Sequence, residues 1–313
     1  MNKCIQGRYL LRPGPTFNAR FIGVVAKAQE LCGATIHGFV ALSSHWHCLA
    51  TYESPKQMAS FHCHLGTHVS KEAGKLHDWS DSIFNRRYNH VELSGEAAVD
   101  RARLKYLLSQ GCKEGLVASP LDWPGPSSTW SLVSGEPLIG DWVDRTALSK
   151  AVEKGEDATE DDFVERLEVK LSPMCSMAHL SAEQYRREIL EIVREVEAET
   201  AAMHREAGTE PLGVERILAQ DPHFRPTEEP ERRRRPWVHA IDPDLRKQMK
   251  EALVFIAMAY RKAADRLKDG DRQAQFPVFT FPPGLPFVMP SSLSGSTLNR
   301  LAPSSDIELL EPG

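Results

Sequence analysis

The chain has 313 residues, of which 41% are hydrophobic and 26% are charged, and its formal net charge is −5. This composition is ordinary for a soluble globular protein. No apolar run approaches the roughly 20 residues of a membrane-spanning helix, and the first residues, MNKCIQGR, lack the apolar core of a secretory signal. The sequence therefore argues against a membrane protein and predicts a cytoplasmic one.

Charge is distributed unevenly along the chain. Residues 1–130 hold 14 basic and 10 acidic side chains and eight of the twelve histidines, whereas the rest of the chain is acidic. A mildly basic, histidine-rich first half is compatible with a partner that bears phosphate groups, although this charge alone does not establish one. The six cysteines include no C-x-x-C pair, so neither a zinc ribbon nor a redox motif is predicted, and free thiols are expected.

Strand and helix signals alternate along the first 110 residues. Residues 5–11 predict a first strand, which stops at the breaker cluster RPGP of residues 12–15. A helix is predicted over 17–32, because apolar side chains recur at helical spacing and Gly33 stands where a terminating glycine is common. The further elements are, in order, strand 34–42, strand 45–52 after a tight Ser43-Ser44 turn, helix 55–76, strand 83–93, and a helix from the N-cap Ser94 to about Gln110.

This order, β-α-β-β-α-β-α, predicts the α+β class, with a split βαβ (ferredoxin-like) antiparallel sheet and helices packed on one face. We assign this domain to residues 1–130, since the sequence WPGPSS at 123–128 marks its exit. Beyond it we expect a linker or small subdomain over 131–180, a mostly helical accessory region over 181–270, and a proline-rich extended tail over 271–313.

The accessory region has its own signals. Helices are predicted over 181–207, 211–218 and 242–267, from charged and amphipathic patterns. The run RRRR at 232–235 is either a solvated segment or a tether that contacts phosphate groups.

The sequence HWH at residues 45–47 is the most informative motif. Alternate side chains of a strand point to the same face, so His45 and His47 would project side by side while Trp46 packs on the opposite face. Two imidazoles held in this way can ligate a divalent metal ion. The alternative interpretation is a pair of strand histidines that bind no metal.

A predicted helix about 60 residues later carries Tyr106 and Gln110, which are at i and i+4 and therefore share a face. Two imidazoles and a carboxamide oxygen leave open positions on a divalent ion, which can polarise a phosphate as a Lewis acid. A tyrosine phenoxide can then attack phosphorus and become covalently attached. Arg103 and Lys105 can supply positive charge, although Lys105 points away from Tyr106 on an ideal helix. A packed core tyrosine and a solvated or capping glutamine are the alternatives.

At these motifs the first 130 residues or so resemble the REP-associated tyrosine transposases, the single-tyrosine transposase branch of the HUH nuclease superfamily. Residues 4–13 (CIQGRYLLRP) resemble the family's first strand and the turn after it, and residues 36–49 (IHGFVALSSHWHCL) its H-u-H hairpin, where u is hydrophobic. Residues 106–117 (YLLSQGCKEGLV), followed by DWP at 122–124 and SS at 127–128, are similar to its catalytic-tyrosine helix and exit.

The resemblance implies a nucleophile, Tyr106, and three metal ligands, His45, His47 and Gln110, with Mg²⁺ or Mn²⁺ as the ion. It also implies nicking and joining of single-stranded or hairpin DNA through a 5′-phosphotyrosine, as in DNA transposition. Two departures concern the geometry: Gln110-Gly111 stands where many members have Asn-Pro, and Ser44 stands where the family often has asparagine. Neither removes a ligand.

Five side chains are weaker candidates for DNA contact: His64, His68, Arg86, Arg87 and Lys105. The two histidines, with His62 and Cys63, also invite a zinc interpretation, but a structural zinc site needs four ligands, so a polar helix face lining a DNA groove is favoured. The two arginines are either phosphate contacts or simple surface charge.

Two other functions compete with the nuclease. One is a DNA-binding protein on the same fold whose catalysis has decayed. The other is a metal-dependent hydrolase of a small phosphoester, in which Tyr106 is structural and no covalent DNA adduct forms. A monomer and a homodimer are both compatible with the sequence.

Overall fold

The computed structural model describes residues 1–84, 86–227, 236–278 and 280–283 of the chain. The arginine run at 232–235 and most of the proline-rich tail lie outside these described residues. The chain divides into two compact units, Met1–Arg246 and Lys247–Gly313, and each is described by itself.

A small antiparallel sheet lies at the centre of the first unit. Its strand order is β1 (Asn2–Lys3), β3 (His45–Thr51), β2 (Thr35–Leu42), so β3 is the central strand. Beyond β1, Cys4 forms a single antiparallel bridge with Phe84. The tight turn between β2 and β3 confirms the predicted hairpin.

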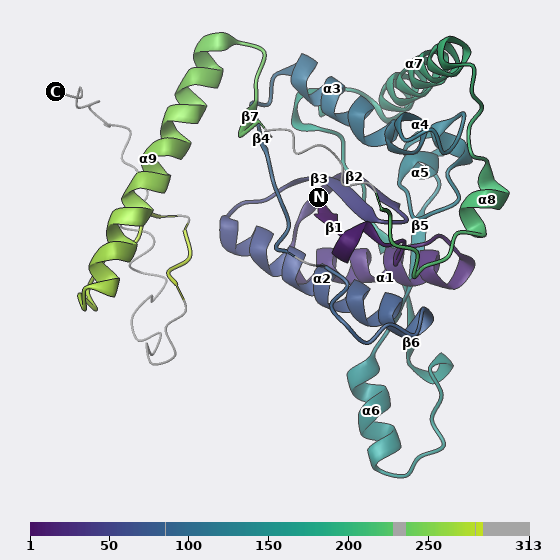
Figure 1. The fold of residues 1–313 in the computed structure, drawn as a ribbon, viewed down its shortest axis with the longest axis horizontal. Coiled ribbons are helices and arrows are strands. Elements are labelled where there is room, and N and C mark those ends of the chain that lie inside the picture. Colours follow the sequence, from purple (N-terminus) through teal and green to yellow (C-terminus); the bar gives the residue numbers. More distant parts are fainter. Residues whose placement is uncertain (85, 228–235, 279, 284–313) are drawn as a thin grey trace. The chain divides into compact units, whose positions relative to one another are not determined.

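Two long helices cover one face of this sheet. Helix α1 (Pro15–Cys32) begins with proline in its first turn and ends at Gly33 in the left-handed conformation, and α2 (Pro55–Leu76) begins at the N-cap Ser54, whose side chain accepts from the Gln57 N–H. Both helices bury apolar side chains against the strand face that carries Phe39 and Trp46. Figure 1 shows the pair on one side of the sheet, with α3 and α7 on the other.

The second face is covered as well. The helices that contribute to its core include α3 (Ala97–Leu108), α4 (Gln110–Lys113), α5 (Thr129–Ser134) and α7 (Ala182–Ala207). Helices α3, α4 and α5 pack on β2, which carries Val40 and Leu42, and α7 packs on these three helices. The close approach of α3 to β2 requires glycine at position 38, because a Cβ there would lie 2.9 Å from Leu107 Cδ2 and 3.1 Å from Ser128 Oγ. Helix α7 is fixed at its start by a capping box between Ser181 and Gln184.

The remaining elements extend this unit. Strands β5 (Leu138–Val143) and β6 (Val164–Val169) form an antiparallel pair whose connection contains α6 (Arg145–Glu153) and η3 (Asp161–Phe163). Strands β4 (Glu92–Leu93) and β7 (Val238–His239) pair in parallel. Smaller helices are η1 (Ile5–Gly7), η2 (Pro120–Asp122), η4 (Cys175–Met177) and α8 (Val214–Leu218), and helix α9 (Pro243–Lys268) leads into the second unit.

The α+β class predicted from the sequence is confirmed, and so are the helices predicted over 17–32, 55–76, 181–207 and 242–267, within one or two residues. All six cysteines are free thiols, as expected. No helix among the described residues is long and apolar enough to cross a membrane. The predicted division into four regions is not tested by these observations and stays a prediction.

The ferredoxin-like sheet is not confirmed. Helices cover both faces rather than one, and the described part of the chain forms three strands in this sheet instead of four. The strand predicted over 5–11 is wrong, because Gln6 and Gly7 adopt positive φ angles of 55° and 71°, which break an extended chain. The strand predicted over 83–93 is reduced to Glu92–Leu93 and the bridge at Phe84.

The start of the tyrosine-bearing helix also differs from the prediction. Its N-cap residue is Glu96 rather than Ser94, and Ser94 instead donates from its hydroxyl to the Glu96 carboxylate at 2.6 Å. The Glu96 carboxylate accepts the backbone N–H groups of Ile241 and Asp242 as well. The Glu96 carboxylate therefore binds the backbone that follows β7 instead of the first N–H groups of α3. As a result, α3 begins without a side-chain cap.

Packing of α1 on β5 gives a first testable prediction. A Cβ at Gly23 would lie 2.6 Å from the backbone nitrogen of Trp142, and backbone cannot move aside as a flexible side chain can. We expect Gly23→Ala to lower the free energy of unfolding by about 3 kcal/mol, the upper end for overpacking. Urea denaturation followed by circular dichroism measures the change.

The matched control is Gly66→Ala, an interior α2 position where an added Cβ meets nothing within 4 Å. It should stabilise the protein by about 0.5–1 kcal/mol, since alanine is the better helix former. Equal effects of the two variants would contradict this account of the α1–β5 contact.

Candidate active site

His45 and His47 lie on the central strand and share one face of it. Trp46 between them is buried against α1 and α2, so strand alternation turns both histidines toward the other face, where α3 packs. The centroids of the two imidazole rings are 5.2 Å apart. The sequence predicted this side-by-side arrangement from the spacing alone.

Tyr106 reaches the histidines from α3. Its neighbours Leu104 and Leu107 are buried against the sheet, whereas the tyrosine itself is 36% exposed. The centroid of its ring lies 5.8 Å from that of His47, in an edge-on arrangement. The structure therefore brings His45, His47 and Tyr106 into one continuous group of ring contacts, with the phenol at its solvent-accessible end.

Two cations flank the tyrosine ring. Arg103 Cζ lies 5.3 Å from the ring centroid, and Lys113 Nζ lies 4.6 Å from it. Both distances are in the range of cation–π attraction. Positive groups close to a phenol also attract an anionic substrate, such as a phosphodiester, toward the hydroxyl.

Gln110 lies after a break in the tyrosine helix. Helix α3 ends at Leu108, Ser109 has φ −76° and ψ −2°, and α4 begins at Gln110. The side chain of Gln110 is 2% exposed, and its Nε2 donates to the backbone carbonyl of Tyr106 at 2.6 Å. The Gln110 amide is therefore bonded to the backbone of Tyr106 rather than placed beside its phenol, which is the arrangement of the alternative capping role. Because the amide nitrogen is the donor here, the carboxamide oxygen is the atom left to act as an acceptor or ligand.

His45 has the protonation state that metal binding needs. Burial lowers the pKa of His45 to about 4, and the charges of Lys3 and of the N-terminal amine lower it further. The ring is therefore neutral at pH 7, and a neutral imidazole is the form that ligates metals. Ser44 Oγ lies 3.1 Å from Nδ1 and holds the ring in place, as an outer partner of a metal-bound histidine does.

Two imidazoles and a carboxamide oxygen form a donor set that suits a divalent ion. The part of the chain that the structure describes contains no group of three or more His, Cys, Asp or Glu side chains that could hold one. A set of His45, His47 and Gln110 contains only two side chains of those types. The ring contacts bring His45 and His47 together with Tyr106, whereas the side-chain hydrogen bond of Gln110 is to the Tyr106 carbonyl, so Gln110 as the third metal ligand stays a prediction.

Lys105 lies on the other side of α3, as its helical position predicts. Its ammonium group donates to Glu195 at 2.9 Å and to Glu199 at 2.8 Å, both on α7. Arg101, one turn earlier, donates to Glu195 at 2.7 Å and to Glu188 at 2.5 Å. These ion pairs attach α7 to the tyrosine helix and occupy two of its cations.

The other candidates for DNA contact are placed apart from the tyrosine. His64 and His68 lie on α2, across the sheet from His45, with ring centroids 4.2 Å apart and both rings against Trp142 of β5. Burial lowers the pKa of both, that of His68 to about 4, so they pack as neutral rings. Arg86 and Arg87 are exposed in the segment after Phe84.

Sequence reasoning missed Lys113 and the environment of Arg103. Lys113 follows Tyr106 by seven residues, or two helical turns, and this spacing was the available signal. Nη1 of Arg103 lies 3.1 Å from Nε2 of His239, which is on β7. No local pattern predicts that contact, because the two residues are 136 positions apart.

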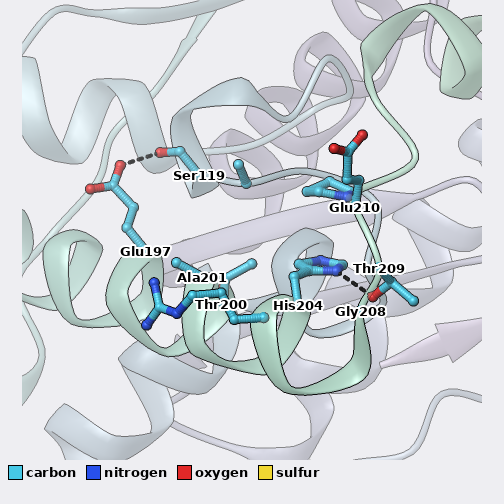
Figure 2. Close-up of a pocket in the computed structure, with 11 residues that line it drawn as sticks. Ser119, Glu197, Thr200, Ala201, His204, Gly208, Thr209 and Glu210 are labelled. Carbon is cyan, nitrogen blue, oxygen red and sulfur yellow. Dashed lines mark hydrogen bonds between the residues drawn. The ribbon is translucent and has the colours of Figure 1, made fainter.

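A cavity of the first unit lies elsewhere, at the end of α7. It measures about 690 Å³, and none of the side chains assigned to the site from the sequence lines it. Figure 2 shows its two hydrogen bonds, from Ser119 Oγ to the Glu197 carboxylate and between His204 and Thr209. The group of His45, His47 and Tyr106 is therefore separate from this cavity.

No family model, curated protein sequence or solved structure matches the chain significantly. The resemblance to the single-tyrosine transposases therefore depends on the motifs quoted above.

The ion pairs between α3 and α7 predict a pH dependence of stability. Hydrogen bonds from Arg101 and Lys105 lower the pKa of Glu195 from 4.5 to about 2. A carboxyl group with a lowered pKa stabilises the fold fully above its unfolded-state pKa, and this contribution is lost as the pH falls through its folded-state pKa. We expect Glu195→Gln to lower the free energy of unfolding by about 1 kcal/mol at pH 7, since partly exposed pairs are screened.

At pH 3 the difference between Glu195→Gln and the unsubstituted chain should shrink. Urea midpoints at the two pH values measure it. Glu191→Gln, at an exposed position of the same helix, is the control and should change little at either pH. An effect of Glu195→Gln that is as large at pH 3 as at pH 7 would argue against an ionic origin.

Proposed function

We propose that this protein cuts and rejoins single-stranded DNA with Tyr106 as the nucleophile, in a metal-dependent reaction of the kind used in DNA transposition. The observation that carries the proposal is the group formed by His45, His47 and Tyr106. The ring centroids of His45 and His47 are 5.2 Å apart, and those of His47 and Tyr106 are 5.8 Å apart. Arg103 and Lys113 lie over the tyrosine ring, which puts two cations beside the proposed nucleophile.

The proposed chemistry is a transesterification at phosphorus. The Tyr106 oxygen forms a bond to phosphorus while the bond to the 3′ oxygen breaks, so the new 5′ end is linked to the protein and a 3′-hydroxyl leaves. The phenolic proton is released to solvent, and the departing oxygen takes one up. Attack by a 3′-hydroxyl on the phosphotyrosine reverses the step and joins the strands, so no nucleotide cofactor is needed.

Each residue of the group has a separate task. His45, His47 and Gln110 would hold Mg²⁺ or Mn²⁺, which supplies Lewis-acid polarisation of the phosphate when bound. Gln110 also donates from its side-chain amide to the backbone carbonyl of Tyr106 itself, which helps to fix the position of the nucleophile. Arg103 and Lys113 bind the phosphate oxygens and orient the scissile bond toward the phenol. Hairpin DNA as the substrate follows from the family resemblance.

Replacement of the nucleophile tests the proposal directly. Purified protein is incubated with Mn²⁺ or Mg²⁺ and labelled single-stranded hairpins taken from repeats that flank its own gene, and the products are separated on a denaturing gel. We expect a covalent protein–DNA band that Tyr106→Phe abolishes while DNA affinity is retained, because the phenol is partly exposed and its ring contacts survive in phenylalanine. His45→Ala and His47→Ala should lose nicking as well.

Each of the other possible outcomes would indicate a different mechanism or function. A band that persists in Tyr106→Phe identifies another nucleophile. Binding without a covalent band in either metal indicates a DNA-binding protein whose catalysis has decayed. Metal-dependent hydrolysis of a small phosphoester, with no DNA adduct and no effect of Tyr106→Phe, indicates a phosphoesterase.

The placement of the cations gives a second prediction. Lys113→Ala should weaken hairpin binding about three- to tenfold and reduce the salt dependence of the affinity by about one ion, because a phosphate contact is lost. Lys105→Ala should leave DNA affinity nearly unchanged and lower thermal stability, since its ammonium group pairs with Glu195 and Glu199. Fluorescence anisotropy at several salt concentrations measures both variants. A larger loss of affinity in Lys105→Ala than in Lys113→Ala would refute this assignment of the two lysines.

A further inference from the structure

Helix α9 exposes a straight face along most of its length. Positions spaced alternately by four and three residues share one side of a helix, and six such positions of α9 are all exposed: Lys247, Glu251, Val254, Met258, Arg261 and Asp265. The apolar pair at the middle is 43% exposed at Val254 and 63% at Met258. Phe255, at the border of the same face, is 74% exposed, more than any other large apolar side chain described.

The opposite side of α9 contacts the residues that follow the helix. The ring centroid of Tyr260 lies 5.2 Å from that of Phe276, and its hydroxyl donates to the Phe281 carbonyl at 3.0 Å. Ala263 is buried. The described part of the tail therefore packs on the Tyr260 side of the helix and leaves the face with Val254 and Met258 open.

The charges on the exposed α9 face are arranged symmetrically about its centre. Going outward from Val254 and Met258, the N-terminal side carries Glu251 and then Lys247, and the C-terminal side carries Arg261 and then Asp265. Each charge thus has an opposite charge at the same distance on the other side of the centre. A face with this property is complementary to a second copy of itself, turned end over end.

We propose that two copies of this protein associate through an antiparallel pairing of their α9 helices. In this pairing Val254 of each copy lies opposite Met258 of the other, which buries the four apolar side chains together. The centre of the pairing lies at position 256, midway between Val254 and Met258. Phe255 is next to this centre, so the two phenylalanines lie close together across the two-fold axis, on one side of the helix pair. Isologous contact of this kind is the usual symmetry of protein dimers.

The flanking charges select the antiparallel direction. Glu251 of each copy faces Arg261 of the other, and Lys247 faces Asp265, so four pairs of opposite charges border the apolar centre. In a parallel pairing each of these residues would face its own copy, and like charges would repel at every level. The occupant that this face fits is therefore a second, antiparallel α9.

Charge reversal tests the pairing. Sedimentation velocity of the full chain, over a concentration series from micromolar to hundreds of micromolar, should show a monomer–dimer equilibrium. Glu251→Arg places arginine opposite arginine in two symmetric pairs and should raise the dissociation constant about tenfold, and Arg261→Glu should do the same. The double variant Glu251→Arg/Arg261→Glu restores opposite charges and should regain the original dissociation constant.

Two further variants keep the test decisive. Met258→Asp should abolish dimers by placing a charge in the apolar centre, and circular dichroism checks that its helix content is unchanged. Glu206→Arg, at an exposed position near the end of α7, is the control and should leave the equilibrium unaltered. A monomer at all concentrations overturns the proposal, and so does a dimer that neither single charge reversal nor Met258→Asp weakens. Failure to restore association in the double variant overturns the antiparallel arrangement.

Discussion

Close packing of α3 on the face of the sheet that carries His45 and His47 is the constraint on which the candidate active site depends. It requires glycine at position 38, since a Cβ there would lie 2.9 Å from Leu107. Burial of Leu104 and Leu107 against the sheet fixes both the height and the rotation of α3. Tyr106, which lies between them in the sequence but on another side of the helix, then reaches the edge of the His47 ring rather than the core.

The same rotation divides the cations of α3 into two groups with different tasks. Arg101 and Lys105 face α7, where Glu195 accepts hydrogen bonds from both. Arg103 faces the tyrosine ring, and Lys113 reaches the ring from α4. One side of the helix thus holds it to the rest of the domain, and the other side remains positively charged where a phosphodiester would bind. The second half of the chain thus contributes to the candidate site indirectly, because the ion pairs of α7 with Arg101 and Lys105 hold the tyrosine helix in position.

The parts of the site that follow from local periodicity could be predicted from the sequence. Strand alternation placed His45 and His47 on one face, and helical spacing separated Tyr106 from Lys105. Contacts between distant segments could not be predicted, such as that between Arg103 and His239. The strand predicted over 83–93 failed for a related reason: Tyr88 stacks on His62 of α2 with ring centroids 4.0 Å apart, so a tertiary contact overrides the local β propensity.

On the proposed function, the charges around the histidines link metal binding to substrate binding. Of the proposed ligands, His45 is neutral at pH 7 and Gln110 carries no charge, while Lys3, Arg103 and Lys113 add positive charge nearby. A divalent ion placed there alone is opposed by these cations and gains no carboxylate to offset them. A phosphodiester supplies the missing negative charge, so each of the two ligands strengthens the binding of the other. On this proposal, His45, His47 and Gln110 would hold the ion more tightly with DNA in place than without it.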